Sequence, residues 1–166
     1  MDPRPSERII GVETEFGCLV DEALFDQPDD AVEALKDFLF FDQKLGVIDM
    51  HSRDEVFEPA RSGGFLINGA RLYIDAVGNH LEYATAETRT LHDLVANDRA
   101  GQRLILRAIR DLGLQGSVRV YNNSVDHFGG HTFGCHENYL VQMTEDFFSV
   151  KTPYLVPFLV SRQVFA

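Results

Sequence analysis

The segment ARLYID of this 166-residue chain alternates strictly between polar and apolar side chains. Leu72 and Ile74 share one parity. Arg71, Tyr73 and Asp75 share the other. Successive side chains of a β-strand point to opposite faces of its sheet, so the segment predicts a strand with one face on a core and one charged face. The chain must therefore fold around a sheet that is covered on one side and polar on the other.

A second segment, residues 8–19, repeats the pattern, with Glu13 and Glu15 opposite its apolar side chains. Glu82, Glu87 and Glu137 add carboxylates on or beside further predicted strands, and we expect the strand of Glu137 to lie in the core. A single acidic strand face is ordinary solvated surface. Several strands that all offer carboxylates indicate a site instead. Carboxylate oxygens are ligands that Mg²⁺ prefers, and a guanidinium pairs bidentately with phosphate, so the polar face predicts a cradle for both.

The remaining chain divides into segments of helical and strand character. We expect strands at residues 8–19, 117–122 and 134–143, two or three short strands within 65–87 separated by turns at Asn68-Gly69 and Gly78-Asn79, and helices from Asp29 or Asp30 to about Phe41, from Thr90 to Gly113, and from Thr152 onward. Residues 42–64 are charged, contain Pro59 and end in two glycines, so we expect a long loop there. This order predicts an α+β fold, with helices on one face of a mainly antiparallel sheet.

The first two predicted helices carry apolar stripes that would cover the sheet. The stripe of the first comprises Val32, Leu35, Phe38 and Leu39; that of the second comprises Leu91, Leu94, Val95, Ile105, Ile109 and Leu112. Thr90 is a plausible N-cap, because Asp93 follows three residues later, and Gly113 is suited to end the helix.

Composition excludes several classes of protein. The net charge of −11 argues against nucleic acid as a partner, because phosphate contacts need a basic face. No apolar run approaches the roughly 18–20 residues that span a bilayer, so we expect no membrane partner. The N-terminus lacks the apolar segment of a secretory signal, so we expect a cytoplasmic protein with Cys18 and Cys135 reduced.

Five motifs occur in order between residue 8 and the C-terminus: GVETEFG, NGARLYID followed by HLEYATAE, NNSVD, GCHENYL and PFLVSRQV. Together they resemble consecutive motifs of the Pup ligase/depupylase family. Members of that family attach the prokaryotic ubiquitin-like protein Pup to lysine side chains, or remove it. The resemblance implies a glutamine synthetase-like catalytic domain of the carboxylate–amine ligases. Because family members are several times longer, residues 1–166 would be its N-terminal part, which a C-terminal part or partner chain would complete.

The resemblance also implies roles for individual residues. Asp75 matches the catalytic aspartate. Arg71 and Thr85 match contacts to ATP, and Glu13, Tyr73 and Glu82 match residues that bind Mg²⁺. Simpler interpretations stay open: Tyr73 could be a packing tyrosine, Thr85 a β-branched filler and Arg71 a surface arginine. Glu15 and Glu87 are expected near the site, and Glu137 and Asn138 receive no role. The spacing of His127, His131 and His136 fits no standard zinc motif.

The function implied by the resemblance is ATP- and Mg²⁺-dependent ligation of Pup to lysines of target proteins, through an acyl phosphate. One alternative is a depupylase that hydrolyses the same isopeptide bond. Another is a non-catalytic fragment or regulatory paralogue. YATAE and GCHENY resemble ligases more, whereas PFLVSRQV resembles depupylases more, so we favour the ligase.

Overall fold

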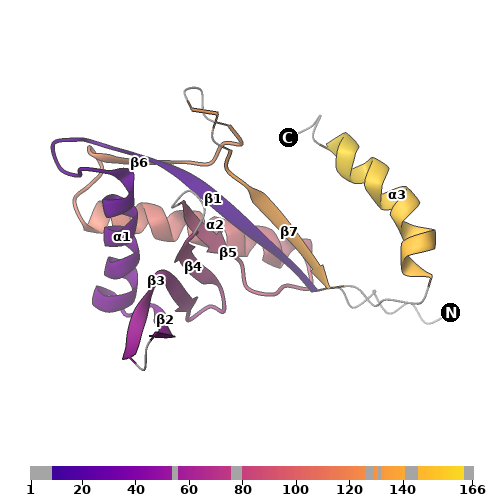
Figure 1. Cartoon of the computed structure of the whole chain (residues 1–166), viewed down its shortest axis with the longest axis horizontal. Coiled ribbons are helices and arrows are strands. Elements are labelled where there is room, and N and C mark those ends of the chain that lie inside the picture. The colour runs from indigo at the N-terminus through magenta and orange to yellow at the C-terminus, as the bar shows by residue number, and fades with distance from the viewer. Residues whose placement is uncertain are drawn as a thin grey trace. The chain divides into compact units, whose positions relative to one another are not determined.

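The structure, a computed structural model, describes residues 9–53, 56–75, 80–125, 129–130, 132–140 and 146–162. The chain divides into two compact units (Figure 1). Ile9–Tyr139 forms the larger unit, and Met1–Arg8 with Leu140–Ala166 forms the smaller one. No helix among the described residues is long and apolar enough to cross a membrane.

The larger unit is built on one sheet. Its strands are β1 (Ile9–Val20), β2 (Gly46–Arg53), β3 (Val56–Leu66), β4 (Arg71–Ile74), β5 (Leu81–Ala84), β6 (Val118–Tyr121) and β7 (Cys135–Leu140). They follow the order β2-β3-β4-β5-β1-β6, and β7 also pairs with β1. The pairs from β2 through to β6 are antiparallel. The predicted α+β fold with a mainly antiparallel sheet is therefore confirmed.

One face of the sheet carries the hydrophobic core. Phe16, Leu72, Ile74, Leu81 and Tyr83 are its buried strand residues around the centre of the sheet. Helices α1 (Pro28–Asp37) and α2 (Leu91–Asp111) cover this face with Val32, Leu35, Ile105, Ala108 and Ile109 (Figure 1). The alternate side chains of these strands therefore lie on the opposite face of the sheet.

Helix α2 begins and ends where its sequence predicts. The Thr90 hydroxyl accepts a hydrogen bond from the Asp93 N–H at 3.1 Å, and Gly113 follows the helix with φ of 74°. Its apolar stripe is only partly buried, because Leu91 and Val95 are exposed. The prediction was wrong for these two residues because the buried positions of the helix start at Gly101, where α2 meets Tyr83.

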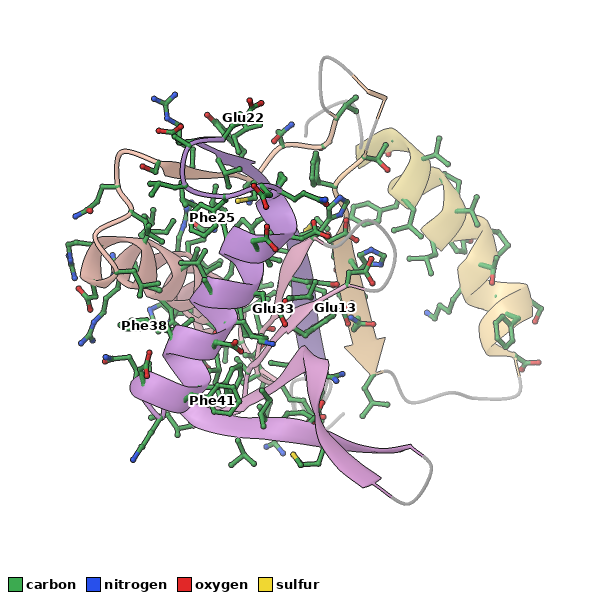
Figure 2. All side chains as sticks on the ribbon, turned by 60° about the vertical axis from the view of Figure 1, so that its left-hand side comes forward. Glu13, Glu22, Phe25, Glu33, Phe38 and Phe41 are labelled. Atoms are coloured by element: carbon green, nitrogen blue, oxygen red, sulfur yellow. The ribbon has the colours of Figure 1, made fainter. Side chains whose placement is uncertain are left out.

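Helix α1 begins earlier than predicted, at Pro28, with Gln27 as its N-cap. Proline suits the first helical position, because the N–H that it lacks would have no helical partner there. Asp30 supports the cap by accepting a hydrogen bond from the Gln27 N–H at 3.2 Å. The helix continues into a π-helical turn, η1 (Phe38–Asp42), and Figure 2 shows Phe38 and Phe41 at this end of the helix.

Residues 42–64 do not form the predicted loop. They contain β2 and most of β3, which pair as a hairpin with an irregularity between Ile48 and Met50. The glycines at the end of this stretch are needed inside the sheet. A Cβ on Gly64 would lie 2.1 Å from the Val47 carbonyl oxygen, and Gly63 has φ of 117°. Glycine in a strand marks such a close backbone approach, so the two glycines lie within β3 and do not end a loop.

Two further predictions need correction. The strand that carries Glu137 was predicted to lie in the core. This prediction was wrong, because β7 is exposed along its length. In the smaller unit, helix α3 (Phe147–Arg162) begins five residues before the predicted start at Thr152 and contains Pro153 and Pro157. The turn at Asn68-Gly69 is confirmed by φ of 84° at Gly69. The predicted Gly78-Asn79 turn, residues 141–143 of the predicted last strand, His127 and His131 lie outside the described residues.

Candidate functional site

The strand register places the predicted site residues on one face. Tyr73 pairs with Glu82, and Glu82 pairs with Glu15, so these three form a row across β4, β5 and β1. The next row joins Arg71 to Glu13 through Ala84. Side chains in paired positions share a face, and this face is opposite to the core. Figure 2 labels Glu13 within this sheet.

Asp75 extends the same face beyond the end of β4. It has the parity of Arg71 and Tyr73, and its N–H donates to the His80 carbonyl at 2.9 Å, which continues the ladder between β4 and β5. The convergence of Glu13, Arg71, Tyr73, Asp75 and Glu82 on one sheet face is confirmed.

Glu82 is the most buried carboxylate of this face, with only 4% of the residue exposed. Burial raises its pKa, and the negative charges of Glu13, Glu15 and Asp75 raise it further, against a lowering hydrogen bond from Tyr73. Burial and the neighbouring Glu82 likewise raise the pKa of Tyr73, so its hydroxyl stays protonated and donates to the carboxylate. Several carboxylates gathered around a buried one give the site an excess of negative charge that a cation would offset.

Arg71 is held from three sides. Its Nη2 lies 2.6 Å from Oδ2 of Asp49 on β2. The guanidinium also stacks against two rings, 5.3 Å from the Phe65 centroid and 4.9 Å from that of Tyr73. Its Nε is buried and has no hydrogen-bond partner among the described residues. The side chain is thus positioned with one donor unsatisfied, and a buried unsatisfied donor signals a missing partner.

Glu15 is occupied by donors from the protein itself. Its Oε2 accepts from the Gly134 N–H at 2.8 Å and lies 3.1 Å from His80 Nδ1, while its Oε1 lies 3.3 Å from His136 Nε2. Burial alone would raise the pKa of Glu15, but these hydrogen bonds outweigh it and lower the pKa. Glu15 shares a strand face with Glu13, but its carboxylate is engaged in linking the start of β7 to β1.

Thr85 does not join the rows. Its Oγ1 accepts a hydrogen bond from the Val12 N–H at 3.0 Å, so the side chain satisfies a backbone group of β1. Glu87 is exposed, and Glu137 accepts from the Tyr139 hydroxyl at 2.6 Å. Asn138 reaches the site, because its Nδ2 donates to Glu13 Oε1 at 2.9 Å. Asn138 could thus orient Glu13, a contact that strand parity alone does not reveal.

Known proteins share both this sequence and this fold. The profile of the family described as Pup-ligase protein matches residues 8–166. The chain belongs to the Pup ligase family. The Pup–protein ligase of Kocuria rhizophila is 39% identical over 171 residues, which cover 95% of this chain and 31% of that protein. The Pup–protein ligase of Acidimicrobium ferrooxidans is 38% identical over 173 residues, covering 99% of this chain and 34% of that protein.

A solved structure agrees with these relatives. The crystal structure of the complex between the prokaryotic ubiquitin-like protein Pup and its ligase PafA matches this chain with a TM-score of 0.64 and 32% identity. The match covers 95% of this chain and 30% of that chain. The chain thus spans about a third of the length of the Pup ligases that it matches.

The polar face suits magnesium and a nucleotide, as the family resemblance implies. No group of three or more His, Cys, Asp or Glu side chains within the described ranges is arranged as a metal site. Mg²⁺ commonly takes only one or two carboxylates from a protein and completes its shell with phosphate oxygens and water. Glu13 and Glu82 can supply these carboxylates, and the guanidinium of Arg71, whose side chain is 38% exposed, can donate to a phosphate.

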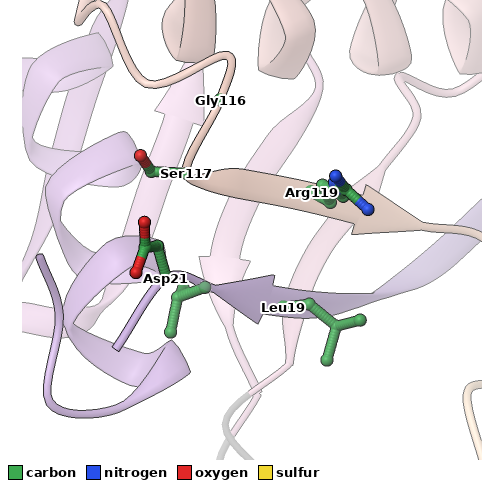
Figure 3. A pocket seen from close by; sticks show the side chains of 6 residues that line it. Leu19, Asp21, Gly116, Ser117 and Arg119 are labelled. Carbon is green, nitrogen blue, oxygen red and sulfur yellow. The ribbon is translucent and has the colours of Figure 1, made fainter. Parts of the chain in front are cut away.

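A hollow at the far end of β1 is separate from this face. Leu19, Asp21, Ser117 and Arg119 are among the residues that line it (Figure 3). None of the residues predicted to bind ATP or Mg²⁺ lines it, and it collects no group of carboxylates. The polar face of the sheet is therefore the candidate functional site.

Two residues of the site were missed in the sequence. These are Asp49 and Phe65. Both lie in the hairpin of β2 and β3. Asp49 falls within the predicted loop of residues 42–64 and Phe65 directly follows it, so no strand parity was assigned to either residue. Val47 and Asp49 share a parity on β2, and Phe65 is paired with Arg71. Val47 and Ile48 are adjacent apolar residues, so residues 46–49 show no alternation of polar and apolar side chains that would predict a strand there.

Proposed function

We propose that this chain forms the Mg²⁺- and ATP-binding face of a cytoplasmic enzyme that ligates Pup to lysine side chains. The observation that carries the proposal is the placement of Glu13, Arg71, Tyr73, Asp75 and Glu82 on one face in a member of the Pup ligase family. Three of these residues are carboxylates that can offset a cation, one is an arginine and one is a tyrosine.

Each residue has a task that follows from its surroundings. Glu13 and Glu82 would hold the cation, and Tyr73 fixes the Glu82 carboxylate by its hydrogen bond. Arg71 donates to the nucleotide phosphates through its guanidinium, because its side chain is 38% exposed. Bound magnesium would neutralise part of the phosphate charge, which lowers the cost of bringing the anion to an acidic face. Such catalysis consists of positioning and electrostatics.

Asp75 acts on the amine. In the ligation that we propose, the γ-phosphoryl group moves from ATP to the side-chain carboxylate of the C-terminal glutamate of Pup, which leaves ADP. The lysine amine then attacks this acyl phosphate, forms the isopeptide bond and expels phosphate. The proton that the amine loses goes to the Asp75 carboxylate, because a protonated amine has no lone pair with which to attack.

The direction of the reaction rests on the relatives. Those with 38% and 39% identity carry the name Pup–protein ligase, which favours ligation over hydrolysis of the same bond. One preparation assayed for both Pup conjugation and isopeptide cleavage separates the two activities. Conjugation without cleavage supports the proposal. Cleavage without ATP-dependent conjugation would reverse it.

Because the chain spans about a third of these relatives, a chimera provides a direct assay. The chain replaces the matching segment of the Kocuria rhizophila ligase, and the fusion is tested for conjugation of Pup. An active chimera that loses activity on Asp75→Asn supports a catalytic role of this chain. A folded chimera without conjugation, when the parent ligase is active, would contradict the proposed function.

A further inference from the structure

The hairpin of β2 and β3 brings Asp49 to the arginine of the proposed nucleotide site. We propose that Asp49 is a positioning residue that orients Arg71 toward the phosphates of a bound nucleoside triphosphate. The inference rests on the proposed function, because it concerns the same site. It deepens that function by adding a residue from outside the motifs that define the family resemblance.

The contacts of Arg71 define its orientation. A flexible arginine side chain on an open sheet face would sample several rotamers, which costs entropy when it must bind in one of them. Here the Asp49 carboxylate holds Nη2 at 2.6 Å, and the rings of Phe65 and Tyr73 lie on the guanidinium. Aromatic faces attract a guanidinium and keep it in one plane. The side chain is thus largely ordered before any ligand arrives.

The same contacts leave the donors that a phosphate needs. A guanidinium has five N–H groups in a fixed fork, and Asp49 takes one at Nη2. Nε stays buried and unsatisfied. A phosphate can therefore be bound by the terminal N–H groups that Asp49 leaves, through charge-assisted hydrogen bonds. Asp49 therefore directs the arginine without exhausting its binding capacity.

A carboxylate on a phosphate-binding arginine can compete with the phosphate, so that its removal strengthens binding. Positioning predicts the reverse. The side chains of the pair are 38% and 25% exposed, so the guanidinium can reach a ligand while it stays paired with Asp49, which favours positioning.

The test compares Asp49→Asn and Asp49→Glu with the unaltered chain, by titration with Mg-ATP, AMP and adenosine. Asp111→Asn is the matched control, because Asp111 also pairs with arginines, Arg107 and Arg110, on helix α2. We expect Asp49→Asn to weaken ATP binding by roughly tenfold and adenosine binding little, since one charge-assisted hydrogen bond has about this effect. Asp49→Glu should recover part of the loss, and Asp111→Asn should bind like the unaltered chain.

A second readout follows the arginine itself. The Nε–Hε resonance of Arg71 in ¹⁵N spectra should broaden or shift toward its disordered position in Asp49→Asn, with the thermal midpoint little changed. Unchanged or tighter ATP binding in Asp49→Asn, while the unaltered chain binds Mg-ATP, overturns the inference and leaves the proposed function standing. An equal loss for ATP and adenosine would show a merely structural role. Failure of the unaltered chain to bind Mg-ATP overturns both.

Discussion

Substituting Gly101 tests whether helix α2 holds the site strand in place. An ideal Cβ on Gly101 would lie 2.4 Å from Cδ1 and 2.5 Å from Cε1 of Tyr83, where 3.4 Å is ordinary contact. The ring would have to retreat by about 1 Å. It has little freedom to do so, because Tyr83 is 1% exposed and Asn68 donates to its hydroxyl at 3.2 Å.

Two effects of Gly101→Ala oppose each other. Alanine gains about 1 kcal/mol over glycine in a helix interior. Overpacking a rigid core costs about 1–3 kcal/mol, and a contact this short belongs near the upper end. We therefore expect a net loss of about 1–2 kcal/mol in the free energy of unfolding. Since Tyr83 and Glu82 are consecutive on β5, the displacement should also weaken Mg-ATP binding.

Urea unfolding followed by circular dichroism measures the loss. Ala100→Gly on the exposed side of the same helix gives the propensity effect alone, about 1 kcal/mol of destabilisation. Tyr83→Leu removes the ring, so the double variant with Gly101→Ala should lose less than the sum of the single variants. A Gly101→Ala chain more stable than the unaltered chain would refute the close packing of α2 on β5.

Two further predictions concern the polar face, and a third concerns Thr85. Glu82→Gln should stabilise the metal-free chain near pH 7 yet weaken Mg-ATP binding. The pKa of Glu82 is raised in the folded chain, so its ionised carboxylate destabilises the fold once pH exceeds the ordinary pKa. An unchanged thermal midpoint of the metal-free variant would contradict this prediction. Glu15→Gln should destabilise the chain near pH 7 and differ less from the unaltered chain in acid. The stabilisation that comes from the lowered pKa of Glu15 exists above the ordinary value of 4.5 and is lost as pH falls through the folded pKa. A difference in urea midpoint that does not change with pH would argue against this. Thr85→Val should lower the free energy of unfolding by about 1–3 kcal/mol, since it leaves the Val12 N–H unpaired, and nucleotide titration of the same variant shows whether Thr85 also contacts ATP.

Local patterns in the sequence were sufficient to predict which side chains of the central strands share a face of the sheet. Arg71, Tyr73 and Asp75 have one parity, and a strand period of two places them together whatever the partner strands are. The cap at Thr90 and the glycine at 113 are similarly local features. The core face was predictable for the same reason, because apolar residues on those strands have the other parity.

Long-range contacts could not be predicted from such patterns. Arg71 meets Asp49 because a hairpin with an irregular register brings β2 to it across β3. Glu15 meets His136, 121 residues later in the chain, because β7 lies beside β1. Neither contact has a sequence period. The glycines at 63 and 64 indicate either a loop or a close approach of strands, and only the pairing of three backbones decides between them.

The central claim is that the polar face binds Mg-ATP and that Asp75 serves the chemistry. Isothermal titration of the unaltered chain, Glu13→Gln and Asp75→Asn with Mg-ATP tests it most directly, alongside conjugation by the corresponding chimeras. We expect Glu13→Gln to weaken nucleotide binding by about tenfold or more, because a metal ligand loses its charge. Asp75→Asn should bind nearly as the unaltered chain does and should abolish transfer to lysine. Loss of nucleotide binding in Asp75→Asn as severe as in Glu13→Gln would make Asp75 a metal ligand and contradict the proposed mechanism.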